Sequence, residues 1–359
     1  MAKLRNITQA EKPQNRASLD TLVQLTTGDD KTRSKFIKRQ KAKAITMAQV
    51  YRLIDLDSRL KKSYWRTYHC NRLILQHGYK MVTTYCNGRW CTVCNRIRMA
   101  KMINAYSVTL MKLNDLYFVT LTTPNVKGSE LSNEIDGMYK SWRCINKNIR
   151  KTYKQGIKGM RKLECTYNPH TDTYNPHFHF LIESKEGAER LISLWLDRYP
   201  KANRKGQDMR KAKQGSLIEL FKYTVKGVHK GRFLAEPLDC IYRALEGRRT
   251  YQPFGIRKVT EEDVDGIISE EVTFKGFRND FWTWETDVKD WVNREGELLT
   301  DYIIEGKLSD WIDSLTEEVR EIVEPEAEQT IIKLNTEQSE DIKWSYYSEM
   351  ADETINNTS

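Results

Sequence analysis

Two alternating runs of residues constrain the fold more than any other feature of this sequence. Residues 160–167 and 176–182 each alternate between apolar and polar side chains, and a turn-forming segment separates them. Since successive side chains of a strand point to opposite faces, the runs predict two paired strands of a β-hairpin. His177 and His179 then share one face of this hairpin with Glu164. The opposite, buried face takes the apolar positions Leu163, Cys165, Tyr167, Phe178, Phe180 and Ile182.

The histidine face of the hairpin is a candidate metal site. A turn centred on residues 171–172 places Glu164 opposite His179, and a turn centred one residue earlier places it opposite His177. Two neutral imidazoles and a carboxylate with open positions suit Mg²⁺ or Mn²⁺ that must also take phosphate oxygens. His170, in the turn, is an alternative third ligand. Histidines that merely pack are the alternative to a metal site.

A second candidate site lies on a short predicted helix at residues 216–227. Leu217, Leu220, Phe221 and Thr224 recur at helical spacing. The polar face then holds Glu219, Lys222, Tyr223 and Lys226. Gly215 and Ser216 supply an N-cap and Gly227 a C-cap. The two lysines would attract a backbone phosphate and favour the phenolate of the tyrosine, whereas a tyrosine used only for packing is the alternative.

Three segments resemble the motifs of a known family, in the same order along the chain. Residues 118–123 (FVTLTT) are similar to the first motif of the HUH endonucleases, residues 176–181 (PHFHFL) to their histidine motif, and the ExxxY of residues 219–223 to their catalytic motif. Within this superfamily, the chain resembles the replication initiators, or Rep proteins, of rolling-circle plasmids. The resemblance covers residues from about Cys70 to about Lys230. It implies an α+β fold, HUH/RRM-like, in which helices flank an antiparallel β-sheet of about five strands.

The resemblance also implies a reaction. In such proteins a tyrosine attacks a phosphodiester of single-stranded origin DNA, which leaves a 5′-phosphotyrosine and a free 3′-hydroxyl for a polymerase to extend. By position, the nucleophile is Tyr223, and Glu219 corresponds to a second catalytic residue that activates water or a hydroxyl at termination. Mg²⁺ or Mn²⁺ held by His177, His179 and Glu164 would withdraw charge from the scissile phosphate.

Four cysteines upstream of the first motif predict a second, structural metal site. Cys70, Cys86, Cys91 and Cys94 form the pattern C-x15-C-x4-C-x2-C. Thiolates at this spacing can close a tetrahedral Zn²⁺ site that leaves no open position. Similar cysteines precede the first motif in plasmid Rep proteins. His69 is an alternative to Cys70, and disulfides are an alternative to zinc. An odd total of seven cysteines, with no signal peptide and no long apolar segment, favours the reducing cytoplasm and no membrane contact.

Charge is divided unequally along the chain. Residues 1–250 hold 49 Lys+Arg against 21 Asp+Glu, whereas residues 251–359 hold 10 against 28. A basic body of this kind favours nucleic acid as partner, and the acidic tail is expected to compete with DNA for it. The candidate DNA-binding residues, for which solvated surface is the alternative, are Arg89, Arg96, Arg98, Lys101, Lys222 and Lys226.

These patterns predict four regions. Residues 1–45 form a basic, largely disordered arm, residues 46–110 a helical zinc-binding subdomain, residues 111–250 the nicking and joining domain, and residues 251–359 an acidic, partly disordered region. Within the third region, apolar residues at alternating steps of four and three over 131–149 predict a long amphipathic helix.

The sequence therefore favours an origin-specific nicking and joining enzyme for plasmid rolling-circle replication. A transposase or conjugative relaxase of the same superfamily is the nearest alternative, and a zinc-dependent DNA-binding regulator without catalysis is the alternative from another class. The expected partners are single-stranded origin DNA, a host helicase and a DNA polymerase. A helicase must come from elsewhere because the sequence has no phosphate-binding glycine loop.

Overall fold

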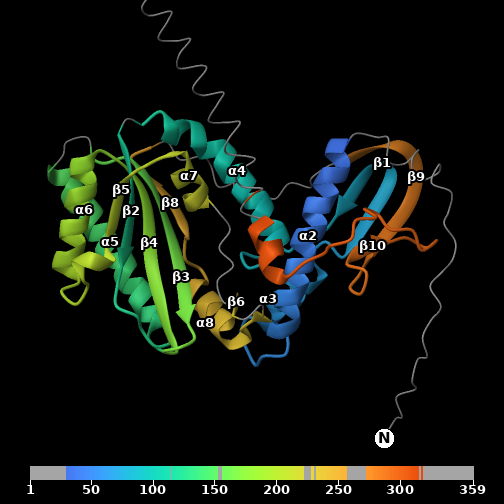
Figure 1. Ribbon diagram of the computed structural model, residues 1–359, viewed down its shortest axis with the longest axis horizontal. Helices are drawn as coiled ribbons and strands as arrows, with labels where there is room; N and C mark the ends of the chain where they lie inside the picture. The colour runs from blue at the N-terminus through green and yellow to red at the C-terminus, as the bar shows by residue number, and fades with distance from the viewer. Residues whose placement is uncertain are drawn as a thin grey trace, which may run out of the picture.

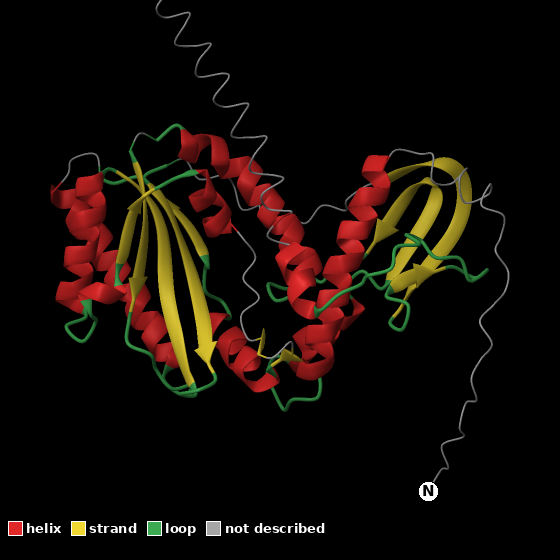
Figure 2. Cartoon of the chain, viewed as in Figure 1, coloured by secondary structure: helices red, strands yellow, loops and turns green. Residues whose placement is uncertain are grey.

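The computed structural model describes residues 30–113, 115–152, 156–221, 228–229, 232–256, 272–314 and 317. Two sheets stand at opposite ends of the view in Figure 1, one of five strands and one of three, with helices between them. Figure 2 shows the same two sheets, with the short strands of a third, two-stranded sheet between them. No helix in these ranges has both the length and the apolar content that crossing a bilayer would require.

The larger sheet is antiparallel throughout, in the strand order β5-β2-β4-β3-β8. Its strands are β2 (Leu116–Thr122), β3 (Gly159–Asn168), β4 (Thr173–Glu183), β5 (Asp208–Lys211) and β8 (Tyr251–Phe254). The predicted α+β class with a five-stranded antiparallel sheet is confirmed. The last strand begins just beyond residue 250, where we expected the nicking domain to end.

The predicted hairpin is the centre of this sheet. Strands β3 and β4 pair so that Glu164 lies opposite His177 and Tyr167 opposite Tyr174. Of the two predicted registers, the structure has the one with the turn centred one residue earlier. The apolar face of the hairpin is buried as expected, with Phe178, Phe180 and Ile182 fully inaccessible to solvent.

Helices α5 (Leu131–Thr152) and α6 (Lys185–Arg198) cover that apolar face, and α8 (Ala235–Leu245) packs against α5. Every apolar position that predicted the long amphipathic helix is buried. Trp142 of α5 packs its ring against Phe180 and Phe254, with centroid separations of 4.9 and 5.1 Å. Burying an aromatic side chain of this size contributes about 2–3 kcal/mol, so this face anchors the sheet.

The histidine face is also covered, at one end, by α4 (Thr92–Met111) and α7 (Gln214–Phe221). Phe118, Met160 and Leu181 of the sheet pack there against Leu220 and Phe221. Helix α7 begins at Gln214, so Ser216, which we expected at its N-cap, lies inside the first turn. There the Ser216 hydroxyl accepts a hydrogen bond from the Lys213 amide.

The second end of the molecule is built around the three-stranded sheet. Helices α2 (Asp30–Leu53) and α3 (Lys61–His69) precede β1 (Leu73–Thr83), which pairs with β9 (Val272–Glu285), and β9 pairs in turn with β10 (Asp290–Val292). The short strands β6 (Val228–His229) and β7 (Arg232–Phe233) pair with each other, and a 3₁₀ turn covers Arg204–Gly206. The expected helical subdomain thus contains a strand whose partner comes from the expected acidic region.

The basic segment that we expected to be disordered differs in the structure. Residues 30–45 form the first part of α2, so a flexible arm does not extend through them. Lysine and arginine have good helix propensity, and Phe36, Ala42 and Ile45 supply a buried stripe. Lys43 is itself buried, and its ammonium donates to the carbonyls of Tyr68 at 2.9 Å and Cys70 at 2.6 Å. Residues 1–29 and 318–359 lie outside the described residues.

Candidate metal centre

Glu164, His177 and His179 meet on the histidine face of the β3–β4 hairpin. Glu164 Oε2 lies 3.6 Å from Nε2 of His177 and 3.8 Å from Nε2 of His179. Each residue offers one ligand atom, and these atoms lie within 4.8 Å of one another. The alternative ligand His170 is exposed in the hairpin turn and is not part of this group.

Hydrogen bonds on the far side of each ring orient the two imidazoles. His177 Nδ1 donates to the carbonyl of Asn175 at 3.0 Å, because a carbonyl can only accept. His179 Nδ1 lies 3.0 Å from the hydroxyl of Thr120. When these Nδ1 atoms carry the protons, both Nε2 lone pairs face Glu164. Partners of this kind commonly fix the tautomer of a metal-ligating histidine.

A buried lysine completes the electrostatics of the group. The Lys162 ammonium contacts Oε1 of Glu164, and both side chains are almost inaccessible to solvent. Burial alone would raise the pKa of Glu164, but its neighbours, foremost the Lys162 ammonium, hold that pKa well below its usual range. Burial is also the largest influence on His179 and lowers its pKa below 6.5. The carboxylate is therefore charged and the His179 imidazole neutral at neutral pH.

Tyr251 of the edge strand β8 links this group to helix α7. Its ring lies 5.7 Å from the Lys162 ammonium and stacks on Phe221, with centroids 6.2 Å apart. Its hydroxyl donates to the carbonyl of Leu220 at 3.3 Å. Burial, and secondarily the Glu164 carboxylate, raises the pKa of Tyr251 well above its usual value, so the phenol stays protonated. The end of α7 is thereby tied to the metal-ligand group.

The donor set fits a hard or borderline divalent cation. Two neutral nitrogens and one carboxylate oxygen suit Mn²⁺ and Mg²⁺, and three protein ligands leave positions for other oxygens. The side chains of Glu164, His177 and His179 are 3%, 11% and 10% exposed, so any ion bound there is held in a site that excludes most bulk water.

Only part of the predicted catalytic helix falls within the described residues. Glu219 lies half-buried on α7, which contacts both β4 and α4. Tyr223, Lys222 and Lys226 lie outside the described residues. Tyr223 follows the last described residue of α7 by two positions in the sequence.

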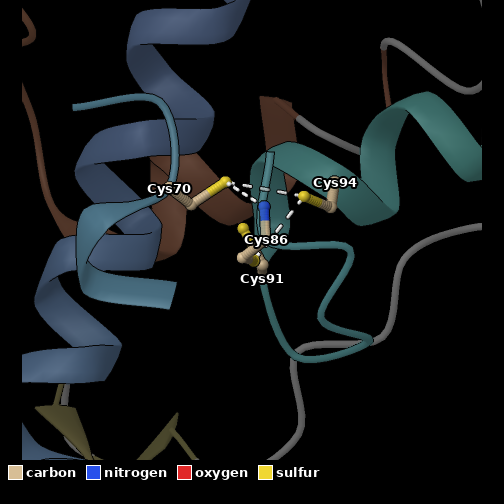
Figure 3. A group of neighbouring side chains, drawn as sticks. All are labelled: Cys70, Cys86, Cys91 and Cys94. Atoms are coloured by element: carbon tan, nitrogen blue, oxygen red, sulfur yellow. Dashed lines mark hydrogen bonds between the residues drawn. The ribbon is translucent and has the colours of Figure 1, made fainter. Parts of the chain in front are cut away.

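The four predicted cysteines come together at the N-terminus of α4, as Figure 3 shows. Cys94 Sγ lies 3.5 Å from Cys70 Sγ and 3.7 Å from Cys86 Sγ, and Cys91 is the N-cap residue of the helix. Backbone amides of Cys86 and Gly88 donate to sulfur at 3.4 and 3.3 Å. Such amides and a helix N-terminus both stabilise thiolates, so the cluster fits a four-sulfur zinc site.

The cysteines differ in their protonation before any metal binds. Hydrogen bonds from the neighbouring thiols, foremost Cys70, lower the pKa of Cys86, whereas burial raises the pKa of Cys91. Metal binding to the full set would therefore release protons. The alternative ligand His69 stacks on Trp65 at 6.2 Å and lies outside the group.

The predicted DNA-binding residues of this region surround the cysteine loop. Arg89 is exposed and donates to the carbonyl of Arg248. Arg98 donates to the Asn87 carbonyl at 3.1 Å and to the Asn95 side chain at 3.3 Å. Arg96, Arg98 and Lys101 are half-buried on α4. Arg98 therefore stabilises the loop that carries the cysteines. The spacing of basic residues alone does not predict this role.

Sequence reasoning missed three residues of the site: Thr120, Lys162 and Tyr251. Thr120 lies within the FVTLTT motif and pairs directly with His179 across β2 and β4, which gives that motif a physical role. Lys162 shares the Glu164 face by strand alternation, and this signal was available in the sequence. Tyr251 reaches the site only through the pairing of β8 with β3, which the sequence pattern does not specify.

Comparison with known proteins agrees with these features. The family model described as "Replication protein" matches residues 79–187. A protein of Staphylococcus aureus named "Protein rep" is 35% identical over 162 residues, which cover 39% of this chain and 69% of that protein. A "Protein rep" of Bacillus amyloliquefaciens is 28% identical over 221 residues, which cover 50% of this chain and 65% of that protein.

No solved structure matches the chain significantly. The agreement with the S. aureus protein nevertheless extends over more than two thirds of that protein. The chain belongs to the Rep family of replication proteins, the initiators of plasmid rolling-circle replication.

Proposed function

We propose that this initiator nicks single-stranded DNA at a plasmid origin through Tyr223 and rejoins strands at termination. The phenolic oxygen attacks phosphorus, the P–O3′ bond breaks, and the released 3′-oxygen becomes a hydroxyl from which a polymerase extends. The protein remains joined to the 5′-phosphate. Single-stranded origin DNA is the substrate, and a host helicase and DNA polymerase are the partners that this product requires.

Three residues would hold a divalent cation for this reaction: His177, His179 and Glu164. When bound, Mg²⁺ or Mn²⁺ polarises the scissile phosphate and neutralises part of its charge. The protein groups orient this site in advance, since Thr120 and Asn175 fix the rings and Lys162 fixes the carboxylate. Because the group is buried, its electrostatic interactions with a phosphate are stronger than they would be in water.

One observation carries the proposal: Tyr251 contacts both the metal-ligand group and the described end of the helix that leads to Tyr223. Tyr251 contacts Leu220 and Phe221 at the end of α7 and faces Lys162 beside Glu164. Tyr223 follows that described helix end by two residues in the sequence. We therefore expect its side chain to lie close to the metal ligands. A regulator that only binds DNA would have no need of this link.

Covalent trapping tests the proposal. The full chain is incubated with a labelled single-stranded origin oligonucleotide and Mn²⁺, and an adduct that survives denaturation is measured. We expect Tyr223→Phe and His177→Ala to abolish both cleavage and the adduct, and Glu219→Ala to spare the first cleavage but impair release. His170→Ala is the matched control, since it removes an exposed histidine of the same hairpin.

Two results would contradict the proposed function. Cleavage retained in Tyr223→Phe would exclude this nucleophile, and equal loss of both steps in Glu219→Ala would exclude the division of labour. Origin binding without any cleavage would instead support a zinc-dependent regulator. A transposase or relaxase would use the same chemistry on other DNA ends, but the similarity to proteins named "Protein rep" favours an initiator.

The cysteine cluster is proposed to hold structural zinc. Four sulfur ligands leave no open position for substrate, so this ion would stabilise the junction of α3, β1 and α4 rather than take part in the reaction. The basic residues around it, Arg89 foremost because it is exposed, are proposed to contact DNA phosphates.

A further inference from the structure

We propose that Lys162 restricts Glu164 to a single metal-binding oxygen and so reserves coordination positions for the DNA phosphate. This inference rests on the proposed function of the site. Lys162 would then be a positioning residue, acting on the substrate through Glu164 and through its own charge.

The geometry divides the two oxygens of the Glu164 carboxylate between different partners. Oε1 contacts the Lys162 ammonium, whereas Oε2 faces Nε2 of both histidines. Strand alternation brings the two side chains together, because residues 162 and 164 of β3 point to the same face. With Oε1 engaged, Glu164 can offer only Oε2 to an ion between the imidazoles.

Burial makes the division hard to undo. The side chains of Lys162 and Glu164 are 4% and 3% exposed, so water does not compete for their contact. The ammonium has a further contact with the ring of Tyr251 on the neighbouring strand. Burying a charge pair is costly, and an apolar pair often stabilises a fold equally well. A lysine at this position is therefore more readily explained by the site than by the stability of the sheet.

The charge of Lys162 also bears on what the site can accept. The positive charge of Lys162 and the negative charge of Glu164 cancel, so this buried pair carries no net charge. A divalent cation then brings the total to +2, which balances one phosphodiester and one phenolate. Without the lysine charge, Glu164 would already neutralise half of the cation, and the attraction for these two anions would fall.

Lys162 both restricts Glu164 to one oxygen and adds a positive charge, and together these effects predict an unusual result for Lys162→Met. Removing a positive charge, and freeing Oε1 to bind, is expected to tighten Mn²⁺ binding by about tenfold. The bound Mn²⁺ is expected to keep fewer water molecules, and nicking is expected to slow. Loss of a residue with a merely structural role would leave metal affinity unchanged or weaken it.

The experiment measures Mn²⁺ binding by calorimetry and the hydration of bound Mn²⁺ by water-proton relaxation, on the zinc-loaded full chain. Lys162→Arg keeps charge and contact and should bind Mn²⁺ like the parent protein. Lys158→Met is the matched control. It removes a lysine whose ion pair with Glu183 at 3.5 Å is partly exposed and distinct from the ligand group.

The outcomes separate this inference from the proposed function. If the parent protein binds no Mn²⁺, the metal centre of the proposed function fails. If the parent binds but Lys162→Met binds equally or more weakly with unchanged hydration, only the role of Lys162 is overturned. Should Lys162→Met not fold, the neutral and polar Lys162→Gln is also expected to bind Mn²⁺ more tightly, and failure to do so overturns the inference equally.

Discussion

At the scale of residues, the candidate centre is arranged so that its ligands are ready before an ion arrives. Glu164 stays ionised because its neighbours, foremost the Lys162 ammonium, outweigh the effect of burial on its pKa. His179 stays neutral because burial lowers its pKa, although the neighbouring carboxylate acts in the opposite direction. A neutral imidazole and a charged carboxylate are the forms that bind a cation, so no proton needs to leave these two groups at neutral pH.

This protonation state predicts how Mn²⁺ affinity depends on pH. Protons compete for the imidazole only below its pKa, which for His179 lies under 6.5. We expect the Mn²⁺ affinity to be nearly constant from pH 8 to 7 and to fall as pH drops further, approaching about tenfold per pH unit for each imidazole that is protonated. Calorimetric titrations across this range measure the profile. A steep fall already above pH 7.5 would contradict the lowered pKa.

The ligands of this centre could be predicted from sequence because they follow strand alternation within one hairpin. The two-residue period of a strand and the position of one turn are enough to predict that His177, His179 and Glu164 lie together. Their supporting residues could not be found in the same way, because Thr120 and Tyr251 come from strands whose pairing partners are set by the tertiary fold. The four cysteines were predictable for a different reason, since metal-ligand spacing is itself local.

At the scale of elements, the edge strand β8 connects the sheet to the helix that precedes the proposed nucleophile. Only four residues long, β8 pairs with β3 and contributes Phe254 to one core and Tyr251 to the other face. The hydroxyl of Tyr251 donates to the carbonyl of Leu220, next to the last described residue of α7. We infer that this bond sets where the chain after α7 begins.

Removing that hydroxyl should affect the reaction more than the fold. Tyr251→Phe loses one hydrogen bond, worth about 1 kcal/mol of unfolding free energy. Small displacements of a reacting group can be far more costly, so we expect nicking to slow by about tenfold while Mn²⁺ affinity is retained.

Tyr139→Phe is the matched control for this variant. It also removes a hydroxyl that donates to a backbone carbonyl, that of Arg249 at 2.5 Å, but from helix α5 on the opposite face of the sheet. Single-turnover nicking and thermal unfolding measure both effects. Equal loss of activity in the two variants would show that Tyr251 acts on stability alone.

The elements themselves were predictable where their periodicity was strong, as for α5 and the β3–β4 hairpin. Composition misled us at α2, where a run of basic residues suggested disorder. The apolar stripe of this helix is buried, and the Lys43 ammonium donates to carbonyls from α3 and the residue after it. Strand β1 could not be predicted from the local sequence, because its partner, β9, follows it by about two hundred residues.

At the scale of the whole molecule, the boundaries drawn from charge do not coincide with the boundaries of packing. Residues after 250 supply β8 to the larger sheet and β9 and β10 to the smaller one. Trp282, Trp284 and Trp291 are buried there with Phe36 and Ile74. A chain cut near residue 250 would therefore lose part of both sheets, and its DNA binding would not isolate the effect of acidic charge.

Deleting only residues 318–359 gives a cleaner test of whether the acidic tail competes with DNA. This segment holds 3 Lys+Arg against 11 Asp+Glu and leaves every described strand intact. We expect the shortened protein to bind random DNA several-fold more tightly at low salt, with the difference shrinking as salt rises. Fluorescence anisotropy measures both. A full-length variant with these acids changed to Gln or Asn is the control, and unchanged affinity in either protein would contradict competition.

The pairing of β1 with β9 has a consequence for synthesis of the protein. Leu73 is translated long before its partner Thr283, and at ordinary ribosomal speeds the delay is about 10–40 s. During that time, the edge of β1 that β9 later covers is open to other chains, and the side chains of Leu73, Leu75 and Val82 are exposed even in the finished fold. Interrupted translation products should consequently be prone to aggregate, and chaperones should bind nascent chains that end before residue 272.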